Sequence, residues 1–173
     1  MTHRFSAVIS NTCAALLLLV PIAAFYYLFN LGSFAELIAS STRLPIQWST
    51  VSTHQWYGMW VLTALYVCVG LVGLYFLRRA FANFAKGEFF NLAKSRDFRR
   101  FSILLLIQTL LTPLHFALSS VLLSLNHPAG QKMLSLAFGS NEIRAIGVAL
   151  VMWVMSNLLV EGSRLQTENR QFV

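Results

Sequence analysis

The chain has 173 residues, of which 57% are hydrophobic and 11% are charged, and its formal net charge is +7. A soluble domain carries about 25% charged residues and exposes much of its side-chain surface to water. This composition excludes an ordinary soluble domain, a disordered chain and a coiled coil, and it predicts an integral membrane protein.

Four stretches of the sequence are long and apolar enough to cross a bilayer as helices, which takes about 20 residues each. No stretch alternates apolar and polar residues as a barrel strand does. Because helices satisfy their own backbone groups in lipid, we expect one all-α membrane domain over residues 1–173, folded as a four-helix bundle. The expected spans cover residues 7–31, 57–77, 101–125 and 143–160, and a tail follows over residues 161–173.

Basic residues are concentrated on one side of these spans. The connection over residues 78–100 holds seven of the thirteen Lys and Arg residues, and the N-terminus and the tail add three. Because cytoplasmic loops of membrane proteins are enriched in Lys and Arg, we expect a multi-pass protein with both termini and this connection in the cytoplasm. The isoelectric point near 10.0 then reflects topology, and direct nucleic-acid binding is not expected.

The connection over residues 78–100 combines basic residues with Phe. Phe81, Phe84 and Ala85 share one helical face, which predicts that the second span continues past Arg79 as an amphipathic helix. Gly87 is a candidate end of that helix. Basic residues beside Phe at a membrane face favour contact with anionic headgroups or a protein partner. The candidate contact residues here are Arg78, Arg79, Phe84, Lys86, Gly87, Phe90, Arg96, Arg99 and Arg100.

Polar groups inside spans are costly in lipid, so they are candidate functional residues. In this sequence they include Asn11, Gln108, His115 and Asn157. We expect His115 to hydrogen-bond to a neighbouring helix. A haem, quinone or lipid site formed by His54 and His115 is the alternative, although a haem site needs two His at one depth and these are expected about three turns apart.

The sequence contains no catalytic constellation and no metal-ligand motif. All six acidic residues are expected in loops or at the ends of spans, which argues against proton-coupled transport. We therefore expect no cofactor, and an enzymatic role is not favoured.

Small residues recur at helical spacing in the fourth span, at Ala145, Ala149 and Ser156, with Met152 on the same stripe. Small residues let membrane helices approach closely, so this stripe predicts a helix–helix contact. A contact with another subunit, of the same or a different protein, would make the chain a structural part of a larger membrane assembly.

The tail "VEGSRLQTENRQFV" is polar, and its first half is predicted to be helical. Its acidic and basic residues balance, so attraction to lipid alone does not explain it. We expect a short protruding helix that docks a cytoplasmic partner through Leu165, Glu168 and Asn169.

The middle connection and the tail resemble those of the bacterial domain-of-unknown-function family 2975. Its members are small four-span proteins with a Phe-x-x-Gly-x-x-Phe loop and a Leu-x-x-Glu-Asn-x-x-x-Val tail. The matching residues are Phe84, Gly87 and Phe90 in the loop and Leu165, Glu168, Asn169 and Val173 in the tail. Relatives are often encoded beside a small helix-turn-helix regulator. The resemblance therefore implies a non-enzymatic regulatory or scaffolding protein that holds such a regulator at the cytoplasmic face.

Overall fold

The computed structural model describes residues 2–30, 46, 48–86, 92–128, 130–136 and 138–169. These residues form four long α-helices and a short 3-10 helix at Trp48–Thr50, and they contain no strand. The long helices are α1 (Thr2–Phe29), α3 (Thr53–Phe84), α4 (Leu92–Ser124) and α5 (Ser140–Asn169). Each is long and apolar enough to cross a membrane. The described part of the chain is therefore all-helical, and its four helices are those of a multi-pass membrane protein.

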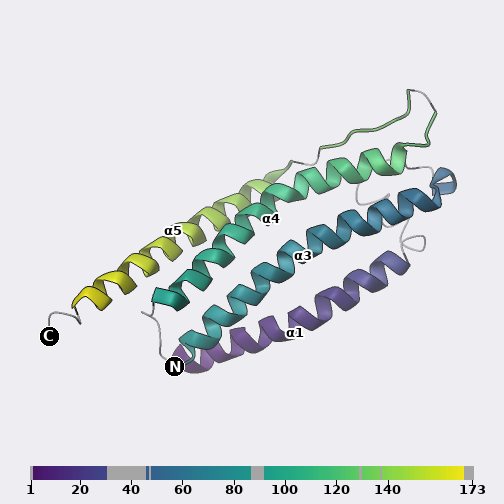
Figure 1. Cartoon of the computed structure of the whole chain (residues 1–173). Helices are drawn as coiled ribbons and strands as arrows, with labels where there is room; N and C mark the ends of the chain where they lie inside the picture. The colour runs from purple at the N-terminus through teal and green to yellow at the C-terminus, as the bar shows by residue number, and fades with distance from the viewer. Residues whose placement is uncertain are drawn as a thin grey trace.

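The helices lie in an open row in chain order (Figure 1). α1 packs on α3, α3 on α4 and α4 on α5, and no extensive contact joins the described parts of α1 and α5. The four predicted helices are confirmed, but α1 and α5 lie at opposite edges of the row and do not close a bundle. Each helix consequently keeps a large apolar surface outside the protein interior, which suits contact with lipid.

Two of the helices run past the C-terminal ends of the spans expected from the sequence. α3 runs past Arg79 to Phe84, which confirms the predicted continuation of the second span. α5 runs to Asn169, which confirms a helical first half of the tail. Gly87, the expected end of the first of these helices, lies outside the described residues.

α5 is displaced along α4 toward the end of the row where α1 begins. The Ser102 hydroxyl of α4 donates a hydrogen bond to the Met152 carbonyl of α5 at 3.1 Å, which fixes the register of the pair. From this point α4 reaches back ten residues to Leu92, whereas α5 continues for seventeen residues to Asn169. At 1.5 Å per residue, α5 extends about 10 Å farther, and Figure 1 shows its last turns beyond the start of α4.

Small side chains allow α4 and α5 to approach closely. Ala149, Ser156 and Ser163 are each 0% exposed and follow one another at seven-residue spacing on α5. This confirms the predicted stripe as a helix–helix contact, although Ala145 is exposed. The contact made by Ala149 and Ser156 lies within the chain, so this part of the stripe is not available to another subunit.

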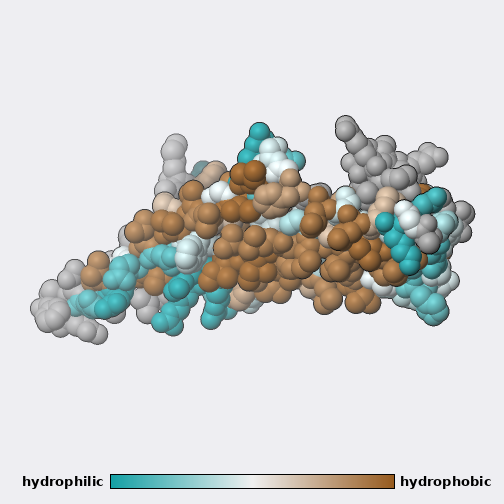
Figure 2. Space-filling view, turned by 90° about the horizontal axis from the view of Figure 1, so that it is seen from above, coloured by the Kyte–Doolittle hydropathy of each residue, from teal (hydrophilic) through white to brown (hydrophobic). Residues whose placement is uncertain are grey.

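The surface of the row has the division expected in a bilayer. Figure 2 shows apolar residues across the middle of one face and polar residues toward both ends. Exposed apolar side chains occur on every long helix, including Leu18 at 70%, Leu65 at 64% and Val151 at 63%. In water such a surface would drive association, whereas in lipid it is the expected state of a spanning helix.

Candidate functional site

The end of the row where α3 finishes and α4 begins carries a dense group of cations, and we call it the basic end. Its described cationic side chains are Arg78, Arg79, Lys86, Arg96, Arg99 and Arg100. α3 places two of the arginines in its last turns, and α4 places three in its first turns. Because the two helices are antiparallel neighbours, residues far apart in sequence meet here.

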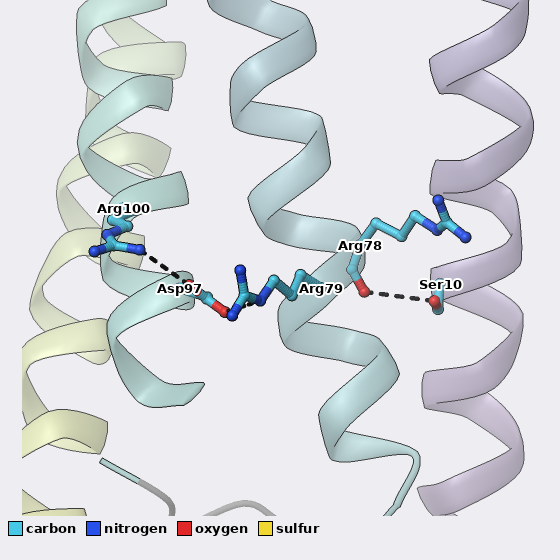
Figure 3. A network of polar contacts seen from close by, with 5 residues as sticks. All are labelled: Ser10, Arg78, Arg79, Asp97 and Arg100. Carbon is cyan, nitrogen blue, oxygen red and sulfur yellow. Dashed lines mark hydrogen bonds and ion pairs between the residues drawn. The ribbon is translucent and has the colours of Figure 1, made fainter. Parts of the chain in front are cut away.

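A single buried carboxylate holds part of this group together (Figure 3). The Asp97 side chain is 2% exposed, and its Oδ2 lies 2.9 Å from Nε of Arg79, which reaches across from α3. Its Oδ1 lies 3.4 Å from Nη1 of Arg100, one turn along α4. The Arg100 guanidinium also lies over the Phe76 ring, 5.3 Å from the ring centroid, in a cation–π arrangement. Asp97 therefore joins α3 to α4.

The other arginines of the basic end are exposed and lack an acidic partner among the described residues. They are Arg78, Arg96 and Arg99. Arg78 contributes its backbone instead: its carbonyl accepts a hydrogen bond from the Ser10 hydroxyl of α1 at 3.4 Å, and its side chain extends alongside α1 (Figure 3). Asp97 thus fixes two guanidiniums and leaves three available to anions outside the protein.

Phe84 does not lie at the surface. It is 7% exposed and its ring centroid lies 6.3 Å from that of Phe98. Together with Ala80 these rings form the hydrophobic cluster just behind the basic end. From the sequence, Phe84 is predicted to contact lipid or a partner. In the structure, the antiparallel packing of α3 on α4 buries it, so it is a core residue. Gly87 and Phe90 lie outside the described residues.

The last turns of α5 form a separate polar surface beside the basic end. Arg164 Nε lies 3.0 Å from Glu168 Oε1, and Arg164 Nη1 lies 4.0 Å from Glu161 Oε1. Between these paired charges, Leu165 is 53% exposed. The side chain of Asn169 is not described. We call Glu161, Arg164, Leu165 and Glu168 the α5 tip.

The opposite end of the α3–α4 pair is held by neutral amides, and we call it the amide end. Gln55 is 4% exposed. Its Nε2 donates to the Leu122 carbonyl at 2.8 Å, and its Oε1 accepts from the Ser52 backbone and from Asn126 Nδ2 at 2.6 and 2.8 Å. Asn126 also donates to the Thr50 carbonyl at 2.9 Å. These amides bind one another and the backbone.

A third group of polar contacts links α3 and α4 in the middle of the row. The Tyr66 hydroxyl and the Thr112 hydroxyl are 3.1 Å apart. His115 Nε2 lies 3.5 Å from the Thr63 hydroxyl, and the His115 ring centroid lies 4.7 Å from that of Tyr66. The expected hydrogen bond from His115 to a neighbouring helix is therefore present. Gln108 packs beside Gly70, where an added Cβ would lie 3.6 Å from its Nε2.

The two candidate histidines do not meet. His54 is exposed in the first turn of α3, whereas His115 contacts Thr63, nine residues farther along that helix. The separation is about 14 Å along the axis, in agreement with the depth difference expected from the sequence. Of the remaining intramembrane polar residues, Asn11 is exposed and Asn157 is half-buried. The described residues contain no group of three or more side chains suited to a metal ion.

Comparison with known proteins bears on the identity of the chain. A family model described as "Protein of unknown function (DUF2975)" matches residues 6–172, nearly the whole length. The chain belongs to the DUF2975 family. No curated protein and no solved structure shows detectable similarity to it. The structure therefore shows where the described residues of the DUF2975 motifs lie on the four helices.

Asp97 is the functional-site residue that sequence reasoning missed. The DUF2975 loop motif directs attention to Phe and Gly, and two acidic residues among seven basic ones look like ordinary loop composition. One signal was present: Asp97 is the only aspartate in the chain, and it lies four residues before the apolar stretch that begins at Phe101. Its partner Arg79 could not be chosen without the register of α3 against α4.

Proposed function

We propose that this protein is a non-enzymatic regulatory or scaffolding protein of the bacterial inner membrane that holds a cytoplasmic protein at its basic end. Both termini and the basic end face the cytoplasm in this proposal, in accordance with the enrichment of cytoplasmic loops in Lys and Arg. The partner class that we propose is a small helix-turn-helix regulator, the protein implied by the family resemblance.

The observation that carries the proposal is the extension of the α5 tip past the start of α4. At a protein interface an exposed apolar side chain supplies contact area, and charges around it set the orientation of the partner. Leu165 at 53% exposure, between the ion pairs of Arg164, has this form. Leu165 lies thirteen residues from Met152, whereas the start of α4 lies ten residues from Ser102, so Leu165 is about 5 Å beyond the start of α4 and leaves room for a partner beside the basic end.

The free arginines have a second role in the proposal, as contacts for anionic lipid headgroups. Arg78, Arg96 and Arg99 are exposed at the expected cytoplasmic surface. Each basic residue near an anionic membrane surface contributes about 1 kcal/mol of attraction. Contact with headgroups would fix how deeply the four helices lie in the bilayer. The α5 tip would then lie beyond the headgroups, where a protein partner can reach it.

The test is co-expression of the full chain with a small helix-turn-helix regulator of the kind that the family resemblance implies, followed by purification of the membrane protein in mild detergent. We expect the regulator to be retained, and Leu165→Glu to reduce its retention at least tenfold. Leu134→Glu is the matched control, because Leu134 is 70% exposed on the connection that follows α4. Unchanged elution volume and helical circular dichroism show that each variant is folded. Failure of the wild-type protein to retain the regulator, or equal losses in both variants, would contradict the proposal.

A further inference from the structure

An apolar groove runs between α3 and α4 on a lipid-facing side of the row. It consists of two adjoining hollows of about 560 and 240 Å³ that share Leu62, Leu65 and Leu118. The larger hollow extends toward the amide end as far as Tyr57 and Leu125. The lining side chains are partly exposed, with Leu65 at 64% and Leu118 at 46%. A molecule dissolved in the bilayer can therefore enter the groove from the side.

The smaller hollow ends at two hydrogen-bonding side chains. His115 and Tyr66 line it together with Leu and Val residues. The Nε2 atom of His115 has a long contact to the Thr63 hydroxyl at 3.5 Å, and the Nδ1 atom has no hydrogen-bond partner among the described residues. A polar group without a partner is costly where no water is available. When the Thr63 hydroxyl donates to Nε2, the neutral ring carries its proton on Nδ1, which is then an unused donor at an apolar site.

We propose that this groove binds a neutral isoprenoid quinone, with the head beside His115 and Tyr66 and the tail along the leucines toward Tyr57. No charged side chain lines either hollow, so a phosphate headgroup would find no counter-charge, whereas the carbonyl oxygens of a quinone need only hydrogen-bond donors. The Tyr66 and His115 rings, 4.7 Å apart, offer flat surfaces on which a quinone ring can stack.

The site uses His115 without His54, and it differs in this respect from a site built on both histidines. It is also independent of the proposed partner docking, because the groove and the α5 tip share no residue. The proposed step is binding alone. The hollows fall within or just below the usual size of small-molecule sites, about 300–1,000 Å³.

The test uses a photoreactive azido-benzoquinone carrying two isoprene units, added to the full chain in phosphatidylcholine nanodiscs. After illumination, mass spectrometry maps the modified peptides. We expect modification within residues 62–69 and 111–118, and we expect excess unlabelled ubiquinone to compete it. The variant His115→Phe keeps an aromatic ring and removes both nitrogens, so competed labelling should fall about tenfold, the effect of one lost hydrogen bond to a ligand.

Two controls separate loss of the site from loss of the fold. His54→Phe makes the same chemical change outside the groove and should leave labelling unchanged. Leu62→Trp fills the groove without altering His115 and should lower labelling, whereas Leu110→Trp, on an exposed part of α4 outside both hollows, should not. The inference is overturned by labelling spread over all four helices, by competition from added phospholipid alone, by cross-links between two copies at the groove, or by equal effects of His115→Phe and His54→Phe.

Discussion

The two ends of the α3–α4 pair are each closed by a buried polar side chain, and the two closures differ in chemistry. At the amide end, Gln55 is 4% exposed and binds the backbone and another amide. At the basic end, Asp97 is 2% exposed and binds two arginines whose side chains are 56% and 58% exposed. The side chains of the amide end hydrogen-bond to one another and to the backbone, whereas the cations of the basic end are exposed at the surface.

This difference in chemistry gives the two ends different roles: the amide end stabilises the fold, whereas the basic end also offers charges to a partner. Neutral hydrogen bonds hold the amide end whatever the ionic strength, and they leave few groups for a partner. At the basic end the carboxylate holds Arg79 and Arg100 in place and leaves Arg78, Arg96 and Arg99 available. One structural anion among many cations gives a surface that is both ordered and positively charged, which suits anionic lipids or an acidic partner surface.

Removal of the buried carboxylate is the strongest test of this comparison. We expect Asp97→Asn to lower the free energy of unfolding by about 2 kcal/mol, less than the 3–5 kcal/mol typical of breaking a fully buried pair, because the arginines are more than half exposed. Unfolding in mixed detergent micelles at increasing dodecyl sulfate measures the change. The loss should shrink at 0.5 M salt, since salt screens exposed charges. A loss that is independent of salt would show that Asp97 acts by packing alone.

At the amide end we expect Gln55→Leu to cost about 1.5 kcal/mol, because neutral hydrogen bonds are lost and the Leu122 carbonyl and Asn126 amide are left without Gln55. The same micelle titration applies. This cost should not change with salt. If the loss were as salt-dependent as that of Asp97→Asn, the two ends would not differ in the way described.

Neighbouring arginines provide a matched pair at the basic end. Arg79 contacts Asp97 and Arg78 does not, so Arg79→Gln should destabilise the fold by about 1 kcal/mol while Arg78→Gln stays within about 0.3 kcal/mol of the wild type. Retention of phosphatidylglycerol, measured by native mass spectrometry, should decrease in Arg78→Gln. Equal destabilisation by both variants would show that the ion pair with Asp97 does not account for the order of this end.

The smallest effect is expected at the α5 tip. Glu161→Gln removes an exposed ion pair with Arg164 whose N···O distance is 4.0 Å, and exposed pairs of this kind contribute about 0.5 kcal/mol or less. Thermal unfolding followed by circular dichroism should show little change. A large destabilisation would mean that the tip packs on the row, which is incompatible with a surface kept free for a partner.

The four helices and some of the contacts between them could be predicted from the sequence. Long charge-free stretches predict spans from the cost of charge in lipid, and the small residues Ala149 and Ser156 predict close packing. The continuation of α3 past Arg79 followed from the face shared by Phe81 and Phe84. In each case the signal is local, carried by residues within a few turns of one another.

The order of the helices in the row and the Asp97 pair could not be predicted in this way. Spanning helices are apolar on nearly all sides, so no polar face indicates which neighbours they have. The same uncertainty led Phe84 to be interpreted as a surface contact, when packing against Phe98 buries it. Pairs such as Arg79 with Asp97 and Tyr66 with Thr112 depend on the register of two helices, which no single stretch of sequence contains.

The most direct test of the proposed role is photo-cross-linking in living cells from a benzoyl-phenylalanine placed at position 165, compared with one at position 134. The full chain is expressed with a small helix-turn-helix regulator of the kind that the family resemblance implies, and cross-linked products are identified by mass spectrometry. We expect the regulator to be captured from position 165 and not from position 134. No capture from position 165, or equal capture from both positions, would contradict the account.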